Sequence, residues 1–204
     1  IEKKMATLRS AKSALRKEIK KTLASLSADE KKKQSKVVTD KVLASPWFEE
    51  SKRVSLFLNM PDEVDTFPLL KAAMSAGKEC FIPHYKGSQM TMVKLSSMED
   101  YDRLPVTKWN IKQPADDDIR PDAIETGGLD VIFMPGLAFT RQGARLGRGK
   151  GYYDNYLHKC QSAGVLPRTV ALIFYQQLVD VVPVEENDVL VQEVLNASPQ
   201  EMGS

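Results

Sequence analysis

The sequence has few cysteines and histidines. Its 204 residues include two of each, Cys80 and Cys160, and His84 and His158. None has the close spacing of zinc ligands, such as Cys-x-x-Cys, so we expect no zinc site. A chain of this length buries enough surface to fold without disulfides. We therefore expect both thiols to be buried or inert, in a reducing compartment such as the cytoplasm.

Long apolar runs are also missing. No stretch approaches the roughly 18 apolar residues of a membrane-spanning helix, and the Lys-rich start lacks the apolar core of a secretory signal. Ile1–Lys4 precede Met5, and we set them aside as a cloning remnant or a disordered end. There is no internal repeat. We expect residues 1–204 to form a single domain, and a monomer without membrane association.

Charge is unevenly distributed along the chain. Residues 1–53 hold 15 Lys or Arg against 7 Asp or Glu, a balance of +8, whereas the whole chain carries only +2. Such asymmetry can indicate nucleic acid or an anionic ligand. The chain has no RNA-recognition motif, KH loop or zinc knuckle, and its aromatics do not alternate with the basic residues. We favour a solvated helix face and expect no nucleic-acid partner.

Apolar periodicity predicts an α/β fold. An N-terminal helical pair comes first, Ser10–Leu26 and a helix that starts at the capping residue Ser27 and stops before Pro46. Strands and helices then alternate, which is typical of an open, mainly parallel twisted sheet with helices on both faces; we expect the pair to pack on it. The other expected helices are Phe67–Gly77 and Gly151–Cys160, and the expected strands are Arg53–Asn59, Glu79–Tyr85, Met90–Leu95, Leu129–Pro135, Arg168–Phe174, Leu178–Val182 and Val189–Leu195. Ser96–Gly128, rich in Pro and acidic residues, is expected to be a long surface excursion.

The segment Gly143–Asp154 carries the clearest chemical signal. It reads Gly-Ala-Arg-Leu-Gly-Arg-Gly-Lys-Gly-Tyr-Tyr-Asp, between a predicted strand and a predicted helix. Glycines let backbone amides approach an anion closely, and a helix N-terminus adds partial positive charge. Arg145, Arg148 and Lys150 add three formal charges, and guanidinium groups can bind phosphoryl oxygens in a bidentate manner. The segment predicts a phosphate site.

This segment is neither a standard P-loop nor a dinucleotide fingerprint. A P-loop has Gly six residues before its Lys and a hydroxyl residue after it, but these positions hold Ala144 and Gly151. The glycine spacing also differs from Gly-x-Gly-x-x-Gly. Without the hydroxyl, magnesium must be held elsewhere. A glycine-rich turn with solvated cations is the alternative interpretation.

Further blocks occur in order along nearly the whole chain. They are Ala11-Lys12 with Arg16, Phe57–Thr66, Pro83–Tyr85, Trp109–Ile111, Pro135–Phe139, Arg145–Asp154 and Pro183–Asp188. Together these blocks resemble the 5-formyltetrahydrofolate cyclo-ligase (methenyltetrahydrofolate synthetase) family. The resemblance implies irreversible conversion of 5-formyltetrahydrofolate to 5,10-methenyltetrahydrofolate, with ATP as co-substrate cleaved to ADP and phosphate, and with Mg²⁺ as cofactor.

The resemblance also implies roles for the cationic residues. Arg145, Arg148 and Lys150 would be catalytic. Lys12 and Arg16 would reach the nucleotide phosphates from one face of the first helix, because they lie four residues apart; ordinary surface charge is the alternative. The remaining residues assigned to ATP are Arg145, Leu146, Gly147, Arg148, Gly149, Lys150, Gly151, Tyr152 and Tyr153.

Two carboxylates are the magnesium ligands that the resemblance implies. Asp154 lies at the start of the helix after the glycines, where a carboxylate facing the helix dipole is the alternative. Asp188 is the second ligand, although Asn187 and Gln192 depart from the family pattern nearby.

For folate, the resemblance points to an aromatic or apolar wall and one carboxylate. A pterin offers N–H groups to an acceptor, and Glu63 is the expected one. The other residues assigned to folate are Leu58, Met60, Tyr85, Trp109, Arg148, Gly149, Lys150, Gly151 and Tyr152. Core packing is the alternative for Leu58 and Met60. A loop anchor is the alternative for Trp109, and packing is the alternative for Tyr152 and, equally, for Tyr153. The polyglutamate tail of folate is anionic, so the basic N-terminal region is expected to help bind it.

Three other functions compete with this hypothesis. They are a different phosphate-handling enzyme, a nucleic-acid-binding module that uses the basic N-terminal quarter, and a non-catalytic protein that binds folate or nucleotide. Folate-dependent ATP turnover would separate the first from a cyclo-ligase, and salt-dependent nucleic-acid binding would revive the second.

Overall fold

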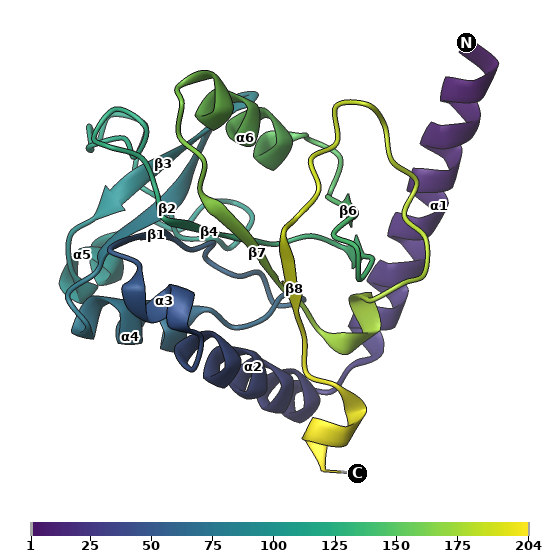
Figure 1. Ribbon diagram of the computed structural model, residues 1–204, viewed down its shortest axis with the longest axis horizontal. Helices are drawn as coiled ribbons and strands as arrows, with labels where there is room; N and C mark the ends of the chain where they lie inside the picture. The colour runs from purple at the N-terminus through teal and green to yellow at the C-terminus, as the bar shows by residue number, and fades with distance from the viewer. Residues whose placement is uncertain (1, 204) are drawn as a thin grey trace.

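The computed structural model describes residues 2–203, with side chains from residue 6 onward, and it shows an α/β sheet flanked by helices (Figure 1). The six-stranded sheet has the order β3-β2-β1-β4-β7-β8. Only β2 and β3 pair antiparallel; the other neighbours are parallel. The strands are β1 (Arg53–Ser55), β2 (Glu79–Lys86), β3 (Gln89–Leu95), β4 (Val131–Met134), β7 (Arg168–Leu172) and β8 (Glu193–Leu195). The prediction of an open, mainly parallel sheet is confirmed.

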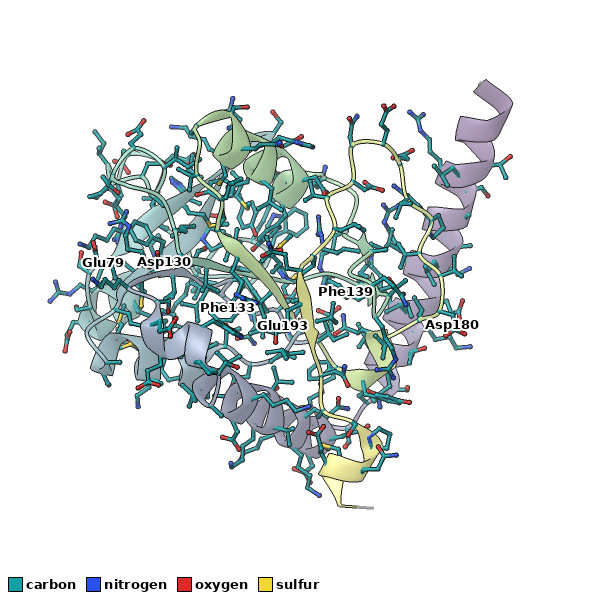
Figure 2. All side chains as sticks on the ribbon, in the orientation of Figure 1. Glu79, Asp130, Phe133, Phe139, Asp180 and Glu193 are labelled. Atoms are coloured by element: carbon teal, nitrogen blue, oxygen red, sulfur yellow. The ribbon has the colours of Figure 1, made fainter. Side chains whose placement is uncertain are left out.

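Residue alternation along β4 explains why helices cover both faces. Val131 and Phe133 enter one hydrophobic core, whereas Ile132 and Met134 enter a second, because successive strand side chains point to opposite faces. The first core contains residues of α2 (Ala28–Leu43), α3 (Pro46–Glu50) and α4 (Phe67–Ser75), and the second contains residues of α6 (Tyr152–Ser162). Figure 1 shows α6 on the opposite side of the sheet from α2 and α4, and Figure 2 shows Phe133 and Phe139 in the interior.

The N-terminal helical pair differs in how its members are placed. The first helix, α1 (Glu2–Ser25), buries Ile19 and Leu23 in the first core, but its N-terminal part projects from the edge of the molecule (Figure 1). Ser27 caps α2 by accepting a hydrogen bond from the Glu30 amide, as the capping sequence predicts. Within residues 2–203, no helix is long and apolar enough to cross a membrane.

Several predicted boundaries are wrong. The β-pattern at Leu178–Val182 forms no strand: Leu178 makes one isolated bridge to Phe139, and Val181 is exposed. The preceding 3₁₀ turn η1 (Tyr175–Gln177) redirects the chain before a strand can form. Likewise, only Glu193–Leu195 of the expected strand Val189–Leu195 pairs with the sheet.

The segment at residues 96–128 does more than run over the surface. It contains the short helix α5 (Met98–Arg103). Its end adds to the sheet edge, because the Lys94 amide donates to the Pro121 carbonyl at 2.9 Å and the Ala123 amide donates to the Met92 carbonyl at 2.8 Å. The excursion thus covers part of β3, which would otherwise be an open edge strand.

Candidate active site

The glycine-rich segment forms a loop between a small hairpin and α6. After β4 the chain makes β5 (Ala138–Phe139) and β6 (Arg145–Leu146), which pair antiparallel. The loop Gly147–Gly151 follows, and Gly151 is the N-cap of α6 with φ +67°, a conformation that favours glycine. The predicted context of strand, glycine loop and helix N-terminus is confirmed, with the hairpin as an unpredicted insertion.

The first helix docks onto this loop through Arg16. Its Nε donates to the carbonyl oxygen of Gly147 at 2.9 Å, and its guanidinium lies against Gly149, where a Cβ would be 3.6 Å from its central carbon. One turn earlier, Lys12 donates to Asp188 at 2.7 Å and to Glu185 at 3.0 Å. Lys12 therefore lies beside residues 185–188, and Arg16 lies beside the glycine loop. Neither residue is a solvated surface charge.

Arg145 and Asp154 form a buried ion pair beneath the loop. Arg145 is 9% exposed, and its Nη2 donates to Asp154 Oδ2 at 2.7 Å. Its Nε is buried and has no hydrogen-bond partner among the described residues. A buried N–H without an acceptor is costly, so this donor suits an anionic oxygen of a bound ligand.

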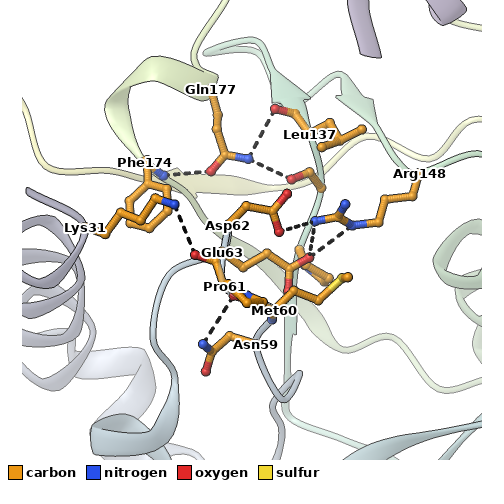
Figure 3. Close-up of polar contacts among 12 residues, drawn as sticks. Lys31, Asn59, Met60, Pro61, Asp62, Glu63, Leu137, Arg148, Phe174 and Gln177 are labelled. Carbon is orange, nitrogen blue, oxygen red and sulfur yellow. Dashed lines mark hydrogen bonds and ion pairs between the residues drawn. The ribbon is translucent and has the colours of Figure 1, made fainter. Parts of the chain in front are cut away.

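Arg148 extends from the loop to an acidic group formed by Asp62 and Glu63 (Figure 3). Its guanidinium pairs with Asp62 at 2.8 Å and with Glu63 at 3.1 Å. Glu63 also accepts from the Met60 amide at 2.9 Å, which fixes the carboxylate in place. Burial raises the pKa of Glu63, and the Met60 amide and Arg148 partly oppose that rise. Lys31 of α2 holds the same turn by donating to the Pro61 carbonyl at 3.2 Å.

Tyr85 and Tyr152 form an aromatic wall next to this acidic group. Their ring centroids are 4.9 Å apart, and the Tyr152 hydroxyl donates to the Gly87 carbonyl in the β2–β3 turn. The Tyr85 amide donates to Gln113 Oε1, and Gln113 Nε2 donates to the Tyr85 carbonyl. Trp109 is 64% exposed in the turn closed by Thr107 and Ile111, where the Lys108 ammonium lies 5.0 Å from its ring centroid. Its contact with folate stays a prediction.

The remaining predicted residues divide into exposed and buried ones. Lys150 is exposed on the loop, and within residues 6–203 it has no paired acid. Leu146 is buried in the first core, and Leu58 packs against that core, as the packing alternative for Leu58 expects. Tyr153 is buried, and its ring centroid lies 5.7 Å from Cζ of the Arg145 guanidinium.

The two predicted magnesium ligands lie close to each other in the fold. Asp154 Oδ1 accepts from the amide of Val189 at 3.2 Å, and Val189 directly follows Asp188. Each carboxylate also has a cationic partner, Arg145 or Lys12. Within the described side chains, no group of three or more His, Cys, Asp or Glu could hold a metal by itself. The pair therefore fits Mg²⁺ that arrives with phosphate oxygens and water, rather than a resident metal cage.

Sequence reasoning missed Asp62 and Glu185. Asp62 shares Arg148 with Glu63, and Glu185 shares Lys12 with Asp188. The Asp62-Glu63 dipeptide and the Glu185-Glu186 run were visible as acidic stretches. Neither carries a periodic signal, however, so their partners become clear only from the fold.

These features define an open α/β protein with a cationic, glycine-rich loop at the N-terminus of α6. Residues 8–197 match the family model of the 5-formyltetrahydrofolate cyclo-ligase family. The chain therefore belongs to that family.

Individual relatives agree with this assignment. The chain is 50% identical over 192 residues to the 5-formyltetrahydrofolate cyclo-ligase of Mus musculus, covering 93% of this chain and 95% of that protein. It is 37% identical to the probable 5-formyltetrahydrofolate cyclo-ligase of Caenorhabditis elegans, covering 94% and 95%. The solved 5,10-methenyltetrahydrofolate synthetase of Aquifex aeolicus superposes with a TM-score of 0.74 at 30% identity, covering 90% of this chain and 88% of that one.

Proposed function

We propose that this chain converts 5-formyltetrahydrofolate to 5,10-methenyltetrahydrofolate while ATP is cleaved to ADP and phosphate. Family membership supports the reaction. The observation that carries the assignment to this site is the loop Gly147–Gly151, around which Arg16, Arg145, Arg148 and Lys150 gather at a helix N-terminus. Such an array suits a triphosphate at one end of the site.

The chemistry sets two requirements. A formamide oxygen is a poor leaving group, so the oxygen first attacks the γ-phosphorus of ATP, ADP departs, and an iminophosphate forms. N10 of the folate then attacks the activated carbon and releases phosphate. The protein must hold the γ-phosphoryl group beside the formyl oxygen and stabilise the charge that spreads over its oxygens.

The cations divide these tasks by position. Arg145 offers its partnerless Nε from below the loop, and Lys150 offers an exposed ammonium with no competing acid among the described residues. Arg148 lies between the loop and Glu63. It therefore links the phosphate end to the folate end, where the nucleophilic formyl oxygen must lie.

The acidic residues serve the two ends in different ways. Glu63, fixed by the Met60 amide, would accept hydrogen bonds from the pterin, and the rings of Tyr85 and Tyr152 would form its wall. Asp154 and Asp188 would hold Mg²⁺. Magnesium would neutralise charge on the β- and γ-phosphates when it binds with ATP.

A cytoplasmic location is part of the proposal. Cys80 and Cys160 are free and buried, and burial raises the pKa of the Cys80 thiol to about 12, so it stays protonated and unreactive. This state fits a reducing compartment.

The direct test is turnover. Purified protein is mixed with MgATP and 5-formyltetrahydrofolate, and the absorbance of methenyltetrahydrofolate is followed together with ADP release. We expect both products in equal amounts and neither when one substrate is omitted. ADP release that does not need folate would instead identify a nucleotide hydrolase.

A further inference from the structure

Gln177 is a buried polar side chain that lies outside the glycine loop. It belongs to η1, just beyond the end of β7, and it is 2% exposed. Its Nε2 donates to the Gly136 carbonyl at 2.7 Å and to the Leu137 carbonyl at 3.2 Å, and its Oε1 accepts from the Phe174 amide at 2.9 Å (Figure 3). Both N–H groups and the carbonyl oxygen are thus engaged, so the side chain is held in one orientation.

These bonds tie together the carboxyl ends of two neighbouring parallel strands. Gly136 and Leu137 follow the end of β4, and Gln177 follows the end of β7, the parallel neighbour of β4 in the sheet. A side-chain amide suits this place and a carboxylate does not, because both facing groups are carbonyl oxygens, which need a donor. Ligands of open α/β sheets bind beyond these strand ends. Gln177 therefore fixes the backbone at the edge of the sheet where a ligand is expected.

The backbone that Gln177 holds lies against Arg145. The Leu137 amide donates to the carbonyl of Leu146, the residue after Arg145, at 2.8 Å. A Cβ added at Gly136 would lie 3.3 Å from Cγ of Arg145, so the Gly136 backbone packs on that side chain. A shift of Gly136 and Leu137 would therefore move the Arg145 guanidinium, which is itself buried.

We propose that Gln177 is a positioning residue for phosphoryl transfer and that it acts through Arg145. The inference rests on the proposed function, in which Arg145 stabilises the transferring phosphoryl group. A buried guanidinium has little room to adjust, so its effect on the transition state depends on where the backbone places it. The triphosphate, in contrast, would also be held by the glycine loop and Lys150. Loss of the Gln177 amide should therefore lower kcat and leave the affinity for MgATP nearly unchanged.

The test compares Gln177→Met with the neighbouring variant Gln176→Met. Each variant removes one side-chain amide from η1 and keeps a side chain of similar length, but the Gln176 amide is bonded to Gln34 and Glu30 of α2, at 2.8 and 2.7 Å. Gln177→Met should lower kcat by about 10- to 100-fold, the range expected when a catalytic group is misplaced by up to about 1 Å, and should change the dissociation constant of MgATP by less than about threefold. Gln176→Met should keep both constants within about twofold of the wild type, because its partners lie on α2.

A double-mutant cycle shows whether the effect passes through Arg145. Arg145→Lys keeps the charge and removes the guanidinium. In that background Gln177→Met should lower kcat by less than about threefold, because the group that Gln177 positions is gone. If Gln177 only supported the fold, kcat would fall by the same factor in both backgrounds.

Urea unfolding identifies which variants are folded. If Gln177→Met does not fold, Gln177→Asn takes its place with the same expectations, because it keeps an amide but withdraws it by one methylene. Equal factors in the two backgrounds, or a kcat of the Gln177 variant that matches that of Gln176→Met, would overturn the inference, while turnover by the wild type upholds the proposed function. A wild type without turnover would remove both.

Discussion

Lys12 and Asp188 are 176 residues apart in sequence, yet the Lys12 ammonium donates to the Asp188 carboxylate across 2.7 Å. Glu185 accepts from the same ammonium at 3.0 Å, and the Lys12 side chain is only 10% exposed. Burial would lower the pKa of Lys12, but the bonds to Asp188 and Glu185 outweigh it and raise the pKa. Lys12 is thus a permanent cation held by two acids.

The pairing of Lys12 with Glu185 and Asp188 predicts how the binding affinities of free ATP and MgATP differ. Without metal, a triphosphate must compete with Glu185 and Asp188 for Lys12 and is repelled by both. Glu185→Gln should therefore tighten binding of ATP in the presence of EDTA by roughly threefold, with a smaller effect when Mg²⁺ is added. Isothermal titration calorimetry measures both constants.

The neighbouring Glu186 provides the matched control. It is exposed and has no partner among the described residues, so Glu186→Gln removes the same charge without freeing Lys12. Its ATP affinity should match the wild type. A Glu185→Gln variant that binds metal-free ATP more weakly would contradict this account of the group formed by Lys12, Glu185 and Asp188, which we call the Lys12 clamp.

Lys150→Ala should remove most turnover and leave the fold intact. The side chain is exposed and unpaired among the described residues, so its loss costs little stability, within about 0.5 kcal/mol. Loss of one preorganised charge at a phosphoryl-transfer site lowers kcat by about 100-fold or more. Steady-state kinetics and a urea unfolding curve give the two readouts. The exposed Lys32 on α2 serves as control, and near-normal turnover in Lys150→Ala would remove its assigned role.

Gly143→Ala should be strongly destabilising. Gly143 has φ +90°, and a Cβ there would lie 1.9 Å from the backbone oxygen of Val191, where the Val191 amide also donates to the Gly143 carbonyl. The added methyl would push the β5–β6 hairpin away from the C-terminal segment. We expect a loss of about 2–4 kcal/mol in the free energy of unfolding.

Two causes contribute to that loss: backbone strain at positive φ and the clash of the added Cβ with Val191. The variant Gly164→Ala separates them. Gly164 has φ +73° but open space where a Cβ would be, so only the backbone strain applies, about 1 kcal/mol. Urea denaturation of both variants gives the difference. Equal losses would show that the contact with Val191 has no energetic effect.

Folate binding should weaken as the pH falls through the pKa of Glu63 in the folded protein, which lies above the ordinary value of 4.5. Burial raises that pKa in the folded protein, so the carboxylate takes up a proton sooner than an exposed one and loses its value as an acceptor. The stability effect has the opposite sign: with a raised folded pKa, the contribution of Glu63 to stability falls as the pH rises through that same pKa.

Binding of 5-formyltetrahydrofolate, measured between pH 5 and 7.5, checks this prediction. Glu63→Gln should bind more weakly at neutral pH and show a flatter profile. Asp62→Asn keeps the Glu63 carboxylate and should retain the slope. An unchanged slope in Glu63→Gln would assign the pH dependence to another group.

Local patterns predicted most elements of this fold. Apolar runs marked the buried strands, and Ser27 capped α2 as expected. The helix α2 ends at Leu43, however, and Pro46 begins the unpredicted helix α3. The failures occurred where local pattern and tertiary context disagree. The apolar residues at Leu178–Val182 have strand propensity, but the chain turns at η1 and leaves Val181 in solvent.

For the site, too, features within one local segment were predicted, whereas contacts that depend on tertiary structure were not. The glycines and cations of the loop were evident because one contiguous segment carries them. Pairings such as Arg145 with Asp154 and Arg148 with Asp62 were not, because each joins charges whose proximity depends on how β6, α6 and the Met60–Glu63 turn are placed. For Asp154, the sequence offered a metal ion or a helix dipole as partner, and the structure adds Arg145.

The Lys12 clamp also has a consequence for biosynthesis. The ribosome makes Lys12 173 residues before Glu185 and 176 residues before Asp188, both of which also follow the glycine loop and α6. A nascent chain that ends just after β7 contains most residues of both hydrophobic cores, but it still lacks the acids that pair with Lys12 of α1. Competence for nucleotide chemistry therefore arises only after Asp188 has emerged, and nascent chains that end before it are not expected to consume ATP.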